Sequence, residues 1–232
     1  KVLNSTITQN AGAGFTTHSD HAYDPQVTMR NDTISNNGDG GVVIRSTTIT
    51  ISDSTIQGNT GSGITIDSDQ SISYVTDNLI DNNERGLVIG GPTHVSGNTV
   101  TNNDSRNIGT FYCQRVDCYG QGGGIAIHDV GVIVDNNQIR DNIARKGGGI
   151  YVTGSGPFEI TNNTIANNQA TYSTSGDEKA AGGIFANINL YGNATSTISH
   201  NTITGNSAPS GGAARLSLYT TGATNAFEYN TI

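Results

Sequence analysis

The stretch "NNTIANNQA" (residues 162–170) holds one branched apolar residue, Ile165, among asparagines and a threonine. A soluble domain normally buries more apolar side chains than this segment offers. Nearly the same phrase returns along the chain, and self-similarity with a period of roughly 20–50 residues is typical of solenoids, propellers and repeat arrays. The fold therefore depends on what the repeat places next to itself.

The repeat is anchored on one branched residue, which usually follows a threonine and precedes an asparagine by three positions. The anchors are Ile7, Ile34, Ile56, Ile80, Val100, Ile139, Ile165, Ile203 and Ile232. The asparagines are Asn10, Asn37, Asn59, Asn83, Asn103, Asn142, Asn168 and Asn206. An asparagine in every complete copy predicts a turn whose side-chain amides bond to one another from copy to copy.

Two further apolar segments complete each unit, a glycine-led one such as "GGVVI" (40–44) and one such as "VIVD" (132–135). Three short strands joined by tight turns form one rung of a coil, in which each strand pairs in parallel with its copy ~4.8 Å away. Stacking buries the few apolar residues of each rung in continuous columns. The sequence thus predicts an all-β fold, one parallel β-helix of about eight three-stranded rungs over residues 1–232. Because the chain opens and stops inside a repeat, we expect a fragment of a longer chain.

The segments "NNTIANN" (162–168), "NNQIRDNIARKGGGIYV" (136–152) and "NTITGNSAPSGGAARL" (201–216) resemble the parallel β-helix repeats of the pectate-lyase-like superfamily. The resemblance covers essentially the whole chain and implies a right-handed coil. That superfamily includes polysaccharide lyases, hydrolases, uronate epimerases, phage tailspikes, adhesins and surface proteins without known activity. The resemblance is thus specific for the fold and leaves the function open.

The net charge, the apolar runs and the two cysteines limit the partners and the cellular compartment that the sequence predicts. The formal net charge of −8 comes without a basic stripe, which argues against nucleic acid as a partner. No run approaches the ~20 apolar residues of a membrane span, so none is expected in this segment. Cys113 and Cys118 favour a disulfide over two free thiols, and a disulfide indicates a secreted or cell-surface protein.

Two long inserts, 104–121 and 169–181, flank the short segment 143–146 at the same corner of the coil. We expect a cleft there, with Arg145 and Lys146 on its floor. Its walls would come from Arg106, Tyr112, Arg115, Asp117, Tyr119, Tyr172, Asp177, Glu178 and Lys179.

Lyase chemistry on a uronan would need a base beside a neutralised carboxylate. Arg140, Arg145 and Lys146 are the candidate bases. Asp117 and Glu178 are the candidate catalytic carboxylates or cation ligands, and Asp141 is a further candidate ligand, with Ca²⁺ the cation considered. No cofactor follows firmly from these residues. A hydrolase would need two carboxylates across the cleft. The alternative is a set of solvated charge pairs, such as Arg140 with Asp141.

Aromatic residues supply the candidate sugar contacts. Tyr151 and Phe185 should point outward on adjacent rungs, where exposed rings suit the apolar faces of sugars. Tyr112, Tyr119, Tyr172 and Arg115 are the further candidate substrate-binding residues. The alternative is that Tyr151 and Phe185 cover each other and the loops.

The insert "TTHSDHAYDPQ" (16–26) offers a candidate metal site made of His18, Asp20, His21 and Asp24. It loosely resembles the Asp-Pro-His neighbourhood of alginate epimerases, although the order of residues differs. The alternative is an ordinary polar loop.

Together these features predict an extracellular carbohydrate-facing module that binds or processes a polysaccharide or cell-surface glycan by lyase- or hydrolase-like chemistry. The alternative is a non-catalytic structural or adhesive segment of a large cell-surface protein. The sequence leaves the sugar, the reaction and the oligomeric state open.

Overall fold

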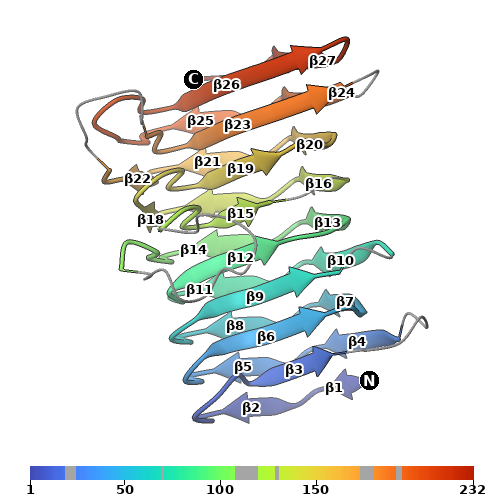
Figure 1. Ribbon diagram of the computed structural model, residues 1–232. Helices are drawn as coiled ribbons and strands as arrows, with labels where there is room; N and C mark the ends of the chain where they lie inside the picture. Colours follow the sequence, from blue (N-terminus) through green and yellow to red (C-terminus); the bar gives the residue numbers. More distant parts are fainter. Residues whose placement is uncertain (19–24, 69–70, 108–119, 129–130, 173–179, 192–194) are drawn as a thin grey trace.

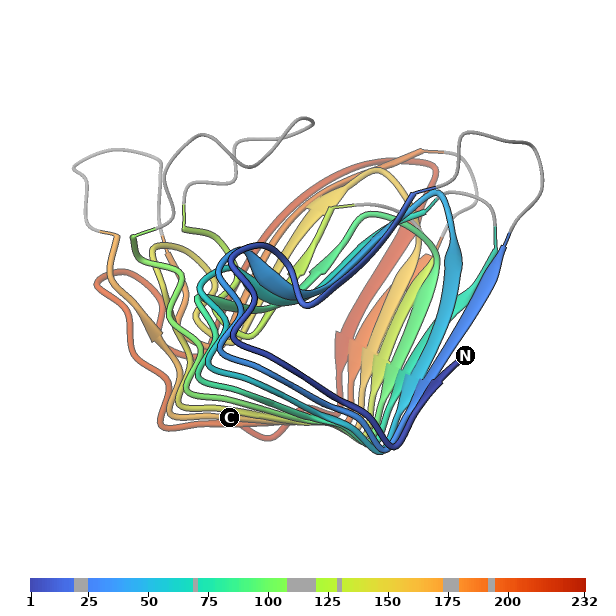
Figure 2. The same cartoon turned by 90° about the horizontal axis from the view of Figure 1, so that it is seen from below.

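The computed structural model describes residues 1–18, 25–68, 71–107, 120–128, 131–172, 180–191 and 195–232. These residues wind into a coil of stacked rungs, and each rung passes through three parallel sheets in turn (Figure 1). Seen along the axis, successive rungs superimpose (Figure 2). The predicted all-β parallel coil is confirmed, and the rung count agrees with the predicted number.

We call the three sheets A, B and C in the order in which the chain enters them. Sheet A contains β1 (Val2–Leu3), β4 (Gln26–Arg30), β7 (Thr48–Ser52), β10 (Ser73–Thr76), β13 (Thr93–Ser96), β16 (Val132–Asp135), β20 (Phe158–Thr161), β24 (Thr195–Ser199) and β27 (Thr224–Glu228). Sheet B contains β2 (Thr6–Thr8), β5 (Thr33–Ser35), β8 (Thr55–Gln57), β11 (Leu79–Asp81), β14 (Thr99–Thr101), β17 (Gln138–Arg140), β21 (Thr164–Ala166) and β25 (Thr202–Thr204). Sheet C contains β3 (Phe15–His18), β6 (Gly40–Arg45), β9 (Ser62–Asp67), β12 (Arg85–Ile89), β15 (Ile125–Ile127), β19 (Ile150–Gly154), β23 (Ile184–Tyr191) and β26 (Ala214–Thr221).

The anchor residues of the repeat form the inner column of sheet B. Ile34 pairs with Ile7 and Ile56, and each following anchor pairs with its neighbour up to Ile203. From Ile34 to Ile203 these side chains are at most 1% exposed. Alternate residues of sheets A and C line the same interior, so one dry core runs the length of the coil.

The predicted asparagine ladder lies at the corner between sheets B and C. Each side-chain amide donates from Nδ2 to Oδ1 of the asparagine one rung on, over 2.9–3.2 Å. The same Oδ1 accepts the backbone N–H of the preceding asparagine, as Asn103 Oδ1 does from Asn83. The ladder thereby pairs buried polar groups at every rung.

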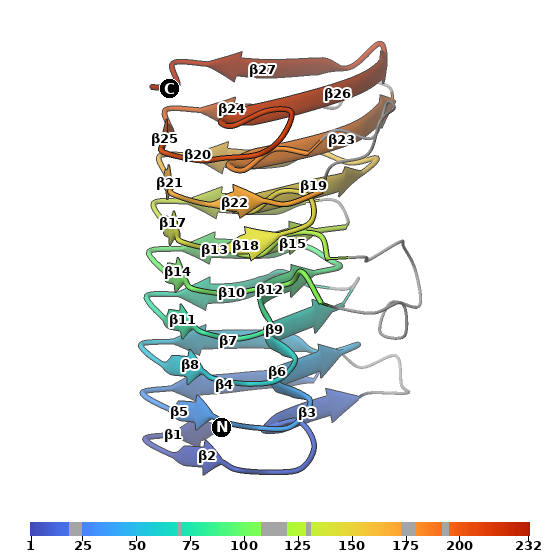
Figure 3. The ribbon, with the colours of Figure 1, turned by 90° about the vertical axis from the view of Figure 1, so that its left-hand side faces the viewer.

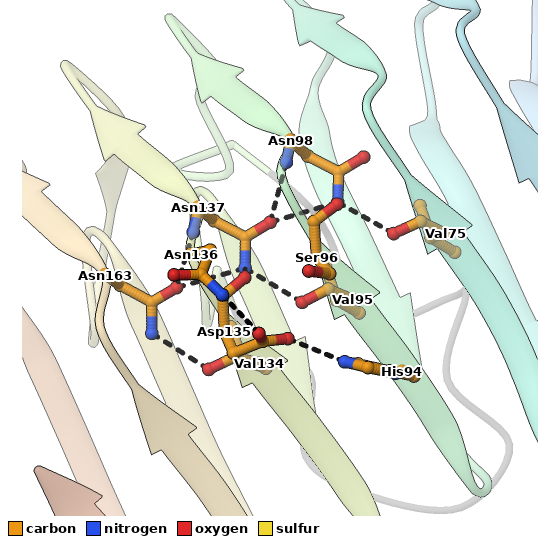
Figure 4. A network of polar contacts seen from close by, with 10 residues as sticks. All are labelled: Val75, His94, Val95, Ser96, Asn98, Val134, Asp135, Asn136, Asn137 and Asn163. Carbon is orange, nitrogen blue, oxygen red and sulfur yellow. Dashed lines mark hydrogen bonds and ion pairs between the residues drawn. The ribbon is translucent and has the colours of Figure 1, made fainter.

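A second ladder, not predicted, occupies the corner between sheets A and B. It joins Asn78, Asn98, Asn137, Asn163, Asn201 and Asn230 by Nδ2–Oδ1 bonds of 3.0 Å. Part of it is drawn in Figure 4. Each of these asparagines stands two residues before an anchor, so the signal was present in the sequence.

The residue before each ladder asparagine takes the left-handed conformation that a sharp corner requires. Examples are Asn36, Asn82 and Asn102 before the first ladder and Asn136 and Asn162 before the second, with φ between 51° and 58°. Asparagine tolerates this conformation better than most residues. The Asn-Asn pairs of the repeat therefore divide the work: one residue bends the chain and the next bonds along the axis.

The corner between sheets B and C carries an extra parallel pair, β18 (Ile143–Ala144) with β22 (Gln169–Ala170) (Figure 3). Single bridges extend this pairing to Asp104 on one side and Ser207 on the other. The segments 143–146 and 169–181 thus begin as stacked strands, where the sequence had suggested loops. No helix in the described part of the chain is long and apolar enough to cross a membrane.

Candidate binding groove on the outer face of sheet C

The outer face of sheet C carries a groove with a volume of about 360 Å³ across β6, β9 and β12. Its floor is a column of outward residues on three adjacent rungs, in which Thr65 pairs with Val43 and Val88. The full lining is Gly38, Asp39, Val43, Arg45, Thr60, Gly61, Ser62, Thr65, Glu84, Arg85 and Val88. Regular strands fix the floor, and the corner between sheets B and C supplies one wall.

Arg85 is the most buried charged residue of this groove, with 3% of its surface exposed. It stands at the start of β12, in register with Ser62 and next to the corner. Burial lowers its pKa to about 10, and the nearby Glu84 carboxylate opposes that shift. A guanidinium in this setting remains charged at neutral pH and is only weakly hydrated, which strengthens any interaction with a ligand oxygen.

Glu84 sits directly before Arg85 and also lines the groove. Burial raises the pKa of its carboxyl group, Arg85 opposes the rise, and the Asp104 carboxylate adds to it. Asp104 is itself held by Arg106, whose Nε lies 2.9 Å from Asp104 Oδ1. This hydrogen bond is the main reason that the pKa of Asp104 is lowered. The groove therefore combines an apolar floor with the Glu84 carboxyl group, the buried Arg85 guanidinium and several hydroxyl groups.

Sequence reasoning missed Arg85 and Glu84. The signal was a departure from the repeat: Arg85 stands where the two preceding rungs have Gly40 and Ser62. A large charged residue at a position that otherwise holds a small one marks a place where the outer surface differs from its neighbours.

Further along sheet C, Tyr151 and Phe185 stack as predicted on adjacent rungs. Their ring centroids are 5.3 Å apart with an interplanar angle of 2°. The expectation that these rings are exposed is wrong, because they are only 6% and 7% exposed and pack with the buried Ala181. The part of the alternative in which the two rings cover each other fits the structure.

His128 extends this aromatic column, with its ring centroid 5.9 Å from that of Tyr151. Both ring nitrogens are buried and have no hydrogen-bond partner among the described residues. Burial, with a smaller contribution from the positive charge of Arg85, lowers the pKa of His128 to about 4. The imidazole is therefore neutral at physiological pH. His128 is a second residue that the sequence analysis did not single out.

The structure brings Arg145, Lys146 and Tyr172 together at the predicted corner. Arg145 Cζ lies 4.8 Å and Lys146 Nζ 5.1 Å from the centre of the Tyr172 ring. Both are cation–π distances. The backbone supports the arrangement, because Tyr172 N donates to Arg145 O over 3.0 Å. Two of the predicted catalytic cations thus pack on a tyrosine of the predicted wall.

The solvated pair considered as the alternative is present. Arg140 Nη1 lies 3.1 Å from Asp141 Oδ2, and both side chains are well exposed. An exposed pair of this kind contributes little to stability and indicates no chemistry.

Several predicted site residues lie outside the described residues. They are Tyr112, Arg115, Asp117, Tyr119, Asp177, Glu178 and Lys179, the predicted metal ligands Asp20, His21 and Asp24, and the predicted disulfide partners Cys113 and Cys118. His18, the remaining predicted metal ligand, is exposed at the end of β3. Among the described residues, no group of three or more His, Cys, Asp or Glu side chains is placed to hold a metal ion.

The stacked rungs, the two amide ladders and the outer groove define a parallel β-helix solenoid. The model of the family described as "right handed beta helix region" matches residues 1–113 and 105–232, so the chain belongs to that family and its coil is right-handed. No curated protein matches the chain, and no solved structure matches it.

Proposed function

We propose that this β-helix is an extracellular carbohydrate-binding module and that a polysaccharide lies in the groove on the outer face of sheet C. The groove itself carries the proposal: its floor of Val43, Thr65 and Val88 offers apolar contact, while Glu84 offers a hydrogen-bonding carboxyl group and the buried Arg85 places a positive charge beside it. Ligand sites commonly combine an apolar surface with a few fixed polar groups. Because the floor runs along three adjacent rungs, ~10 Å of the coil, it suits a short stretch of a linear polymer.

Binding is favoured over turnover by what surrounds the predicted catalytic cations. Arg145 and Lys146 both pack on Tyr172, and neither belongs to the lining of the groove. A secreted or cell-surface location follows from the proposed ligand and remains part of the proposal. A chain of this kind would hold the polymer and leave its bonds intact.

The test fills the groove without disturbing the core. Thr65→Trp places a large ring on the floor, and Thr164→Trp, on the exposed face of β21 in sheet B, is the matched control. Affinity electrophoresis through gels with neutral or acidic polysaccharides should show retardation of the parent chain and of Thr164→Trp, and loss of retardation in Thr65→Trp. Equal retardation of all three proteins would rule out this groove, and release of reducing ends would show turnover.

The second candidate is a structural or adhesive segment of a larger surface protein. It is favoured by the packing of Arg145 and Lys146 on Tyr172, which engages two of the predicted catalytic cations within the chain itself. If no polysaccharide in the panel retards the parent chain, this second reading replaces the first.

A further inference from the structure

A second surface that is chemically suited to sugars lies on the outer face of sheet A, away from the groove. β10, β13 and β16 are adjacent there, and Tyr74 pairs with His94, which pairs with Ile133. Tyr74 is 41% exposed, and Ile72, just before β10, is 51% exposed. Large apolar side chains gathered on an otherwise polar sheet face indicate a contact surface.

The imidazole of His94 is fixed in this surface by a carboxylate. His94 Nε2 lies 2.6 Å from Asp135 Oδ1, one rung along the axis (Figure 4). Since an ionised carboxylate can only accept, Nε2 carries a proton and donates to Asp135. Among the described residues, the bond to Asp135 is the only hydrogen bond of the His94 side chain. Nδ1 is therefore open to a hydrogen bond with a ligand hydroxyl.

Asp135 is itself held by the second amide ladder. Asn137 Nδ2 donates to Asp135 O over 2.8 Å and to Asn163 Oδ1 over 3.0 Å. Asn136 Nδ2 donates to the second carboxylate oxygen, Asp135 Oδ2. The Asp135 carboxylate and the His94 ring are thus positioned before any ligand arrives, which reduces the entropy lost on binding.

The rings of Tyr74 and His94 form a tilted aromatic pair beside the Asp135 carboxylate. Their centroids are 6.1 Å apart with an interplanar angle of 54°. A sugar presents an apolar face of C–H groups and a rim of hydroxyls, and Tyr74 and Asp135 match the two. Tyr74 and Asp135 lie two rungs apart, ~10 Å along the axis. This separation exceeds the length of a single sugar ring.

We propose that Tyr74, His94 and Asp135 form a second carbohydrate-binding surface, separate from the groove on sheet C, that takes a neutral oligosaccharide of two or more rings. This extends the proposed function and rests on it for the ligand class. The outward residues of the three strands, from Tyr74 and Thr76 to Ile133 and Asp135, include no lysine or arginine. The Asp135 carboxylate would therefore repel a uronate, so the ligand is neutral.

The experiment titrates the full chain with neutral hexasaccharides of glucose, mannose and xylose, and with an oligouronate, while the His94 ring ¹⁵N signals are followed by NMR. We expect at least one neutral oligomer to shift these signals and the oligouronate to leave them unchanged. Tyr74→Ala should weaken the affinity by about five-fold, as the loss of one aromatic contact predicts. Asp135→Asn, which keeps the shape, should weaken it as well.

Two controls separate this proposal from the groove. Tyr219→Ala removes a more exposed tyrosine from β26 of sheet C and should leave the titration unchanged. Thr65→Trp should abolish binding in the groove and leave the His94 shifts intact. The proposal is overturned if no neutral oligomer shifts the His94 signals, or if Tyr74→Ala and Asp135→Asn bind as the parent chain does. Neither result bears on the groove, which the gel assay tests separately.

Discussion

At the scale of single residues, the amide ladders explain how so polar a chain forms a core. An asparagine side chain both donates and accepts, so one residue type repeats indefinitely along the axis. In the first rungs of the second ladder other residue types take the asparagine position: Asp32 stands two residues before Ile34, and Ser54 stands two residues before Ile56. Asp32 cannot donate: its oxygens accept from Ser5 N and Arg30 N, and its own N–H is met by Ser54 Oγ over 3.0 Å. The Ser54 hydroxyl adapts because it can turn to donate to Ser52 O.

Removal of one ladder member should cost far more than its size suggests. Asn83 is 3% exposed, accepts from both nitrogens of Asn59 and donates to Asn103 and to Ile56 O. Asn83→Ala leaves several buried groups without partners, and we expect a loss of roughly 3–5 kcal/mol in the free energy of unfolding. Gln57→Ala, at an exposed position of β8, should change it by less than about 0.5 kcal/mol. Urea unfolding measures both, and similar losses would contradict the ladder's role.

His128 gives stability a pH dependence of known sign. Its pKa falls from the ordinary 6.5 to about 4 on folding, so the native state resists protonation. As the pH falls from about 6.5 to about 4, the unfolded chain gains a proton that the folded chain lacks, and stability declines by up to about 3 kcal/mol. His128→Phe keeps a ring against Tyr151 and removes this titration. Its stability relative to the parent should rise through that window, and a constant difference between pH 7 and pH 4 would contradict the assignment.

At the scale of the elements, the glycines that begin the strands of sheet C serve close approach. Glycine can also serve a sharp corner, where it takes a positive φ. That holds for Gly120, Gly122 and Gly147, whose φ lies near +60°, but Gly124 has no such φ. A Cβ on Gly124 would lie 2.6 Å from Gly149 O and 2.9 Å from Ile139 Cγ2. The next rung occupies the space that a side chain would need.

Gly124→Ala should therefore destabilise the coil although the backbone conformation permits alanine. We expect a loss of about 1–3 kcal/mol, the usual cost of forcing an extra carbon into a packed site. Gly12→Ala is the matched control, because nothing lies within 4 Å of its added Cβ. It should be neutral or slightly stabilising through reduced freedom of the unfolded chain. Thermal unfolding of the two variants compares them directly, and an equal midpoint shift would remove close approach as the reason.

The strands themselves could be predicted because their information is local and repeated. Ile165 predicts little alone, but its alignment with Ile139 and Ile203 fixes the strand, its inward face and its pairing. The groove was less accessible to the same reasoning. Arg85 becomes buried only because of what lies around it on the outer face, and the repeat says nothing of that face. The exposure of Tyr151 and Phe185 was predicted wrongly for the same reason. The direction of these side chains follows from the alternation along a strand, whereas their exposed fraction depends on the rest of the chain.

At the scale of the whole molecule, a solenoid separates its stability from its binding surfaces. The inward columns and the ladders hold the coil together. The outward columns of each sheet are free to vary, since a change there touches only the rungs above and below. Sheet C presents the groove and sheet A presents Tyr74 and His94. The two proposed contact surfaces therefore share no residue.

Because each rung contacts only its neighbours, the coil also predicts how the effects of two ladder mutations combine. Asn83 and Asn103 share two hydrogen bonds on adjacent rungs, so the first substitution already breaks what the second would remove. Asn83→Ala with Asn103→Ala should cost less than the sum of the single changes, by roughly 1 kcal/mol or more. Asn59 and Asn168 share no partner and lie several rungs apart, and their alanine variants should add within about 0.5 kcal/mol. Equilibrium unfolding of the two double-mutant cycles decides. Coupling as strong between the distant pair as between the neighbours would mean that the coil responds as one rigid unit, and a stack of nearest-neighbour contacts would no longer describe it.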